Sequence, residues 1–120
     1  MTKLVNLTPH PIRLVVGEKE LILPPSGQVA RVNQGYRDLG TLGVDAVAIP
    51  VVATAYGEIT GLPPEEPGVF FIVSALVAQA AWATGRLDVL APDTGAGAIR
   101  DQEGRIVGVT RLIGHPDFRP

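Results

Sequence analysis

The sequence contains no cysteine, and several other features that would point to a particular class of protein are scarce. The lack of cysteine excludes disulfides and thiol catalysis, and it removes the commonest structural zinc ligands. Charged residues form only 18% of the chain and leave a net charge of -2, which gives no basic field for nucleic acid. No hydrophobic run approaches the length of a bilayer span, and the N-terminal residues lack the pattern of a signal peptide. We therefore expect a cytoplasmic protein without membrane or nucleic-acid partners.

The residues that are present suffice for one hydrophobic core. The chain has 120 residues, of which 46% are hydrophobic, so residues 1–120 are predicted to form a single domain. Fourteen glycines and eleven prolines indicate many turns. A small domain with so little charge leaves apolar surface that self-association can cover. The composition therefore predicts a homo-oligomer.

The first third of the chain reads as short strands separated by turns. Residues 4–7, 12–16, 20–23 and 28–32 are predicted strands. Between the first two, the Thr-Pro-His-Pro element of residues 8–11 favours an extended backbone, because proline restricts both itself and the residue before it. Gly17 to Lys19 has the composition of a hairpin turn.

The middle of the chain is less regular. Residues 33–45 mix glycines with polar and apolar side chains, and they are predicted to form a loop with one weak strand. Residues 46–55 are rich in valine but contain Pro50, which indicates an edge strand or a bend at that residue. Residues 69–73 are the most hydrophobic segment and are predicted to form the central strand.

The sequence predicts one helix, over residues 74–85. Ser74 is placed to cap it, Gly85 to end it, and small residues run nearly all round, so we expect it to be buried. Residues 98–100 and 105–109 flank a turn and predict a C-terminal hairpin, followed by a flexible tail over residues 113–120. The expected fold is α+β, mostly antiparallel strands with one buried helix.

Candidate chemistry begins with the histidines. His10 and His115 each precede a proline, and histidine is the usual acid–base or metal-binding residue. Metal sites need several ligands at close spacing, and neither histidine has such a cluster near it in the sequence. His10 is therefore expected to shape a turn or to line a pocket, and no cofactor or metal is predicted.

The loop of residues 92–97 contains Asp93 and Thr94 within an Asp-Thr-Gly sequence. Aspartic proteases bring two such loops together, but there the loop belongs to a strand context that this segment lacks. The alternatives are a turn satisfied by its own side chains and a loop that grips ligand hydroxyl groups. Arg86 and Arg100 flank the loop in sequence and are candidates for holding phosphate. Tyr56 is a candidate for stacking on a base, whereas Trp82 fits either stacking or the core.

Several stretches, in order, resemble a widespread family of small hypothetical proteins of bacteriophages and prophages. They include the Asn-Leu-Thr-Pro-His-Pro-Ile element of residues 6–12, Pro-Ser-Gly at 25–27, Val-Ala-Arg at 29–31, Tyr-Gly-Glu at 56–58, and the segments 71–80 and 99–108. In size and order of elements the chain is also similar to phage Thoeris anti-defence proteins, small oligomeric sponges that sequester cyclic nucleotides without cleaving them. This second resemblance is architectural, and architecture alone is a weak guide to function.

Together these observations favour a non-enzymatic phage-type binding protein that sequesters a small nucleotide-like signalling molecule. Its expected ligand is a phosphate-bearing compound such as a cyclic nucleotide, held by Arg86, Asp93, Thr94, Arg100, His10 and Tyr56. A second hypothesis is a structural or protein-interaction accessory protein without a small-molecule ligand. A third is a hydrolase that uses His10 or Asp93.

Overall fold

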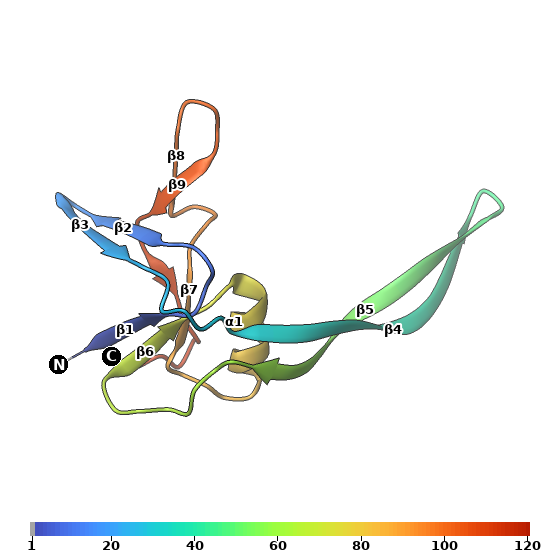
Figure 1. Ribbon diagram of the computed structural model, residues 1–120. Helices are drawn as coiled ribbons and strands as arrows, with labels where there is room; N and C mark the ends of the chain where they lie inside the picture. Colours follow the sequence, from blue (N-terminus) through green and yellow to red (C-terminus); the bar gives the residue numbers. More distant parts are fainter. Residues whose placement is uncertain (1) are drawn as a thin grey trace.

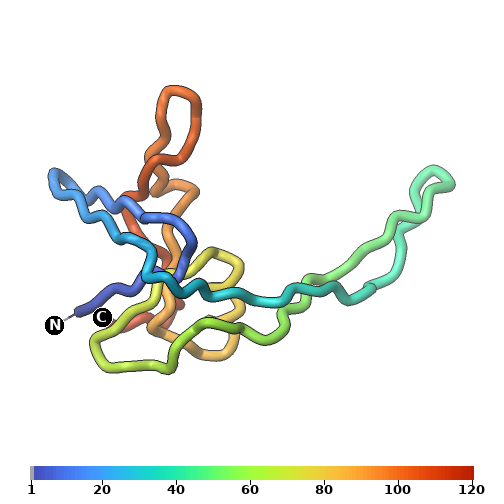
Figure 2. Tube along the Cα trace, viewed as in Figure 1, coloured from blue at the N-terminus to red at the C-terminus, as the bar shows by residue number. Residues whose placement is uncertain are grey.

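The computed structural model describes residues 2–120, which form a body and a long projecting arm (Figures 1 and 2). The fold is α+β, with mostly short strands and one short helix. The molecule measures 58 × 39 × 27 Å and has a radius of gyration of 17.4 Å. A compact domain of this length would have a radius of gyration of about 14 Å. The excess comes from the arm, which extends away from the body.

The first sheet of the body carries the main core. It contains β1 (Lys3–Asn6), β6 (Val69–Ile72), β7 (Val89–Pro92) and β10 (Leu112–Ile113), in the order β1-β6-β7-β10. Strand β6 lies inside the sheet, as its hydrophobic sequence predicted. Its pairings with β1 and β7 are parallel, and only β10 runs antiparallel to its neighbour. The expectation of mostly antiparallel strands is therefore wrong for this sheet, because a helix connects β6 to β7 and returns the chain in the same direction.

Helix α1 (Ala75–Ala83) is this connection. The Ser74 hydroxyl accepts a hydrogen bond from the Val77 amide, and Gly85 adopts a positive φ just after the helix, so both end signals were read correctly. The expected burial of the helix is confirmed for one face. Only one face, including Val77 and Ala78, lies in the core with Leu7, Phe71, Val73 and Val89, whereas Ala75, Gln79 and Ala83 are exposed.

The second sheet packs against the first through a smaller core. It contains β2 (Ile12–Val16), β3 (Lys19–Leu23), β8 (Ala98–Arg100) and β9 (Ile106–Val109), in the order β3-β2-β9-β8. Strands β2 and β9 are parallel, and the outer pairs β2–β3 and β8–β9 are antiparallel. Ile12, Leu14 and Val109 pack with Ile72 of the first sheet.

Residues 113–120, predicted to form a flexible tail, contact the body. The Phe118 ring lies 5.6 Å from that of Phe70, centroid to centroid. The Phe118 amide donates to the carbonyl of His115 (2.8 Å), and Gly114 lies against Leu90. The aromatic pair places this segment beside the strand β6 that leads to helix α1.

The arm is a hairpin of two long strands, β4 (Arg31–Val44) and β5 (Val47–Thr60). The expectation of a loop with one weak strand over residues 33–45 is wrong, because β4 pairs with β5 as far as Val44, with register shifts at residues 33 and 39. Pro50 lies within β5 opposite Thr41, and it is tolerated because both strands of a two-stranded ribbon are edge strands. Asp45 and Ala46 form the turn at the tip, both with positive φ.

Candidate functional site

The structure divides the six candidate ligand residues between different places. His10 and Thr94 line a cavity of about 530 Å³ between β2, β3 and β9. Tyr56 and Arg86 line a second cavity of about 500 Å³ at the base of the arm. Arg100 lines neither, and its guanidinium donates to the carbonyl of Gly104 (2.6 Å) at the turn between β8 and β9. The residues therefore do not converge on one site.

The first cavity is mainly apolar. Ile12, Ile22 and Val107 line it, together with prolines and the backbone of Gly108. The charged residue in its wall is Arg13, whose guanidinium is already paired with Glu20 (3.0 Å). Ligand pockets are usually apolar with a few polar groups at the edge, and this cavity has that character. It therefore suits an apolar ligand or side chain better than a multiply charged phosphate.

Asp93 is held by its own loop and by Arg111. Its Oδ2 pairs with Nε of Arg111 (2.6 Å), and its Oδ1 accepts a hydrogen bond from the amide of Gly95 (2.9 Å). The hydrogen bond from Arg111 is the largest cause that lowers the pKa of the Asp93 carboxyl, and the bond from the Gly95 amide is the second. Sequence reasoning missed Arg111 and assigned the loop's positive charge to Arg86 and Arg100. Nothing in the sequence near Asp93 indicates that its partner is Arg111, which lies between β9 and β10.

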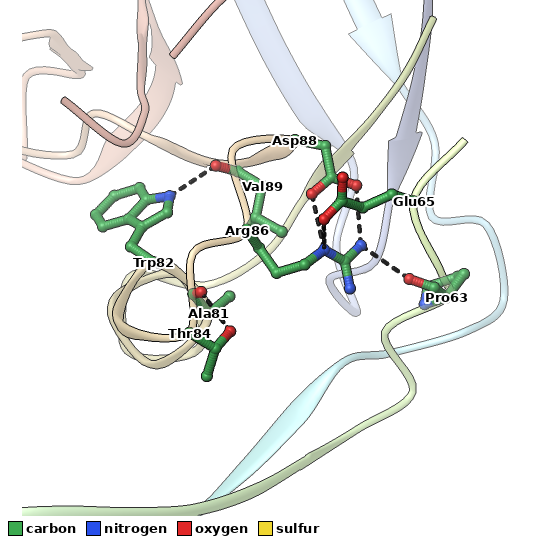
Figure 3. A network of polar contacts seen from close by, with 8 residues as sticks. All are labelled: Pro63, Glu65, Ala81, Trp82, Thr84, Arg86, Asp88 and Val89. Atoms are coloured by element: carbon green, nitrogen blue, oxygen red, sulfur yellow. Dashed lines mark hydrogen bonds and ion pairs between the residues drawn. The ribbon is translucent and has the colours of Figure 1, made fainter. Parts of the chain in front are cut away.

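Arg86 is engaged by residues of two neighbouring loops (Figure 3). Its guanidinium forms two hydrogen bonds to Asp88 (2.9 and 2.8 Å) and one to the carbonyl of Pro63 (2.9 Å), with Glu65 at 3.4 Å. The bonds to Asp88 raise the pKa of Arg86. These contacts tie the proline-rich loop before β6 to the loop after helix α1.

Trp82, the one tryptophan, belongs to the body packing (Figure 3). Its indole N–H donates to the carbonyl of Val89 (2.8 Å), and its ring packs against the main core. The ring also lines a cavity of about 290 Å³ together with Asp93 and Thr94, so its packing in the body does not exclude contact with a ligand.

The Asn-Leu-Thr-Pro-His-Pro element is organised by Asn6, which was not among the candidates. The Asn6 side chain is buried at the end of β1, and its amide donates to the carbonyls of His10 (2.8 Å) and Leu23 (3.0 Å). Its carbonyl oxygen accepts from the Thr8 amide (2.9 Å) and hydroxyl (2.7 Å). The sequence feature that could have identified Asn6 is an asparagine at the end of a strand, just before a turn with two prolines. His10 itself is exposed at the rim of the first cavity.

The arm presents the most unusual surface of the molecule. Its base is fixed to the body, because Val32 and Ile59 pack against the main core and the Tyr56 hydroxyl donates to Gln79 of helix α1 (3.1 Å). Beyond the base, large apolar side chains lie in solvent: Tyr36 is 67% exposed and Leu42 59%. Such a surface on a two-stranded ribbon is typical of an element that another protein covers.

The strand register places the apolar side chains of the outer arm, residues 40–51, on a defined face. Paired residues of an antiparallel ribbon share a face, and successive residues alternate between faces. The pairs Val44–Val47, Leu42–Ile49 and Gly40–Val51 therefore form one apolar face of the outer arm. We call it the apolar strip; it consists of Leu42, Val44, Val47, Ile49 and Val51. The opposite face carries smaller or polar residues at the same level, Thr41, Gly43, Ala48 and Pro50.

Comparison of the chain with protein-family models, curated proteins and solved structures finds no match. Within residues 2–120, helix α1 is too short to cross a membrane. The same residues contain no group of three or more histidine, aspartate and glutamate side chains arranged for a metal ion.

Proposed function

We propose that this protein is a non-enzymatic interaction protein that acts by laying its arm against another protein surface. The observation that carries the proposal is the arm itself, two paired strands of 14 residues each with apolar side chains in solvent. An isolated two-stranded ribbon is at best marginally stable in water, and its unpaired edges and apolar face both favour association. A surface of this kind supports a structural or accessory role, such as that of a small phage protein within an assembly.

Site-specific labelling in the cells that produce the protein tests this proposal. Because the chain has no cysteine, one cysteine introduced as Ile49→Cys in the apolar strip reports on that strip alone. The matched control is Gln102→Cys, in the exposed turn between β8 and β9. We expect a membrane-permeant maleimide to label Ile49→Cys much more slowly than Gln102→Cys in cells, and both at similar rates after denaturation. Equal rates in intact cells would contradict the proposal.

A second candidate function is sequestration of a nucleotide-like ligand, favoured by Tyr56 and Arg86 lining the same cavity of about 500 Å³. An aromatic ring beside a guanidinium suits a base and a phosphate. Against it, Arg86 is already bound by Asp88 and Pro63, and Glu58 adds negative charge to the same wall.

Calorimetry with linear and cyclic nucleotides tests the second candidate. Under this hypothesis Tyr56→Ala weakens binding about tenfold or more, the value of one stacking contact. Arg100→Ala, an exposed residue that lines neither cavity, is the matched control and leaves affinity unchanged. If the wild-type protein binds no nucleotide, this function is excluded. If Tyr56→Ala binds as tightly as the wild type, the ligand does not bind in the cavity lined by Tyr56.

A further inference from the structure

We propose that the partner of the arm is the arm of a second copy of this chain, packed antiparallel about a two-fold axis through the apolar strip. This inference rests on the proposed function, which does not specify the partner, and it names that partner. It follows from the order of side chains along one face of the arm.

The apolar strip has charges of opposite sign at its two ends. Arg37 pairs with Ala53 and shares the face of the strip on the side toward the body, whereas Asp45 stands in the turn at the tip. Between them the face holds only apolar side chains and Gly40. Neither Arg37 nor Asp45 takes part in an ion pair within residues 2–120. A surface with a cation at one end and an anion at the other complements itself when a copy is turned end to end.

The spacing is compatible with a two-fold arrangement. Residues 37 and 45 are separated by roughly 26 Å along the strand at about 3.3 Å per residue. A two-fold axis near residue 41 places Arg37 of each copy opposite Asp45 of the other and brings Leu42 and Ile49 of both copies to the centre. Isologous dimers are built in this way, with the same patch used twice. The parallel arrangement instead places like charges together at both ends.

The size of the strip indicates the strength of the dimer. The overlap of the two copies runs from residue 37 to residue 45, about 26 Å, and a ribbon face about 10 Å wide therefore offers roughly 260 Å² per copy. This is less than the roughly 800 Å² per partner of a standard stable interface. We therefore expect a weak dimer, with a Kd of about 0.1 mM or higher, whose population changes with protein concentration.

Sedimentation velocity over a concentration series tests the dimer, with one disruptive variant and one matched control. Leu42→Asp places a carboxylate in the centre of the strip, and Thr41→Asp places it one residue away on the opposite face. We expect Leu42→Asp to raise the dimer Kd about a hundredfold or more, because the charge is buried against apolar side chains. Thr41→Asp is expected to dimerise like the wild type. The fluorescence of Trp82, which lies in the body, verifies that both variants remain folded.

Charge reversal tests the antiparallel arrangement separately. Arg37→Glu and Asp45→Lys each place like charges together in the dimer, and each is expected to raise Kd about tenfold at low salt. The double variant restores opposite charges at both ends and is expected to return Kd close to the wild-type value. Rescue requires that residue 37 of one copy faces residue 45 of another, because the two residues lie far apart within one arm.

Three results would overturn the inference. A wild-type monomer at the highest concentration would exclude the second copy as partner; slow labelling of Ile49→Cys in cells would then still support the proposed interaction function with another protein. Equal effects of Leu42→Asp and Thr41→Asp would exclude the apolar strip. Failure of the double charge reversal to recover dimerisation would exclude the antiparallel arrangement.

Discussion

At the scale of single residues, Asn6 explains why the Thr-Pro-His-Pro element follows β1. The two prolines remove backbone donors and prevent regular pairing, so the turn needs hydrogen bonds from a side chain. Asn6 supplies both donors and an acceptor, and it joins the turn to the end of β3 through the carbonyl of Leu23. The element therefore serves as a junction between the two sheets.

We predict that Asn6→Ala lowers the free energy of unfolding by about 2–4 kcal/mol, because it leaves buried carbonyl groups without donors. Asn6→Asp is expected to be worse, since a carboxylate would face the carbonyls of His10 and Leu23. Urea denaturation followed by Trp82 fluorescence measures both. Similar stability of Asn6→Asp and the wild type would contradict this role.

The acid stability of the protein depends on carboxyl groups whose pKa values are lowered in the folded state. The bond to Arg111 lowers the pKa of Asp93, and the Arg105 amide is the largest cause that lowers the pKa of Asp101. A lowered folded-state pKa stabilises the fold above the unfolded-state pKa, and this contribution is lost as the pH falls through the folded-state value.

We therefore predict that the melting temperature falls as the pH is lowered below about 4, near the unfolded-state pKa of aspartate. Asp93→Asn should lower the melting temperature at neutral pH and reduce its dependence on acid. Scanning calorimetry between neutral and acid pH measures both effects. A variant with the same acid slope as the wild type would show that Asp93 does not contribute to it.

At the scale of elements, the sequence predicted what local signals specify. Helix α1 was placed within two residues at each end because its cap, its alanines and its terminal glycine act locally. Strand β6 was recognised because burial on both faces gives a continuous hydrophobic run. Strand β4 was missed because most of its side chains are exposed, so it shows no alternation between a buried and a polar face.

The candidate site was less predictable than the fold. The arginine partner of Asp93 lies 18 residues away in sequence, and the arginine at the nearer position, Arg86, turns toward Asp88 and Pro63. The antiparallel pairing of β10 with β7 brings Arg111, just before β10, beside Asp93, just after β7, and short-range patterns do not encode this pairing. The exposed apolar residues of the arm were visible in the sequence, but only the strand register places Leu42, Val44, Val47 and Ile49 on one face.

The one-sided burial of helix α1 gives a matched pair of substitutions. Val77→Asp would place an unpaired charge in the main core and is expected to lower the free energy of unfolding by several kcal/mol. Gln79→Asp lies two residues along on the exposed face and should cost less than about 1 kcal/mol. Thermal denaturation of the two variants measures the difference, and equal losses would contradict the observed orientation of the helix.

At the scale of the whole molecule, the hydrophobic cores and the exposed apolar surface of the arm lie in different parts of the structure. The two cores lie in the body, and only the base of the arm contributes to them through Val32 and Ile59. The outer arm adds length and apolar surface without adding to either core. Its stability therefore depends on what covers it, and its backbone hydrogen bonds should open easily in an isolated monomer.

Hydrogen–deuterium exchange of the wild-type protein over a concentration series tests this account most directly. The amides of residues 38–52 are expected to exchange rapidly at the lowest concentration and to become strongly protected as the concentration rises. The amides of β6 and helix α1, in the body, should remain protected throughout and serve as the internal control. Exchange of the outer arm that stays fast at every concentration would contradict the claim that a second copy covers it.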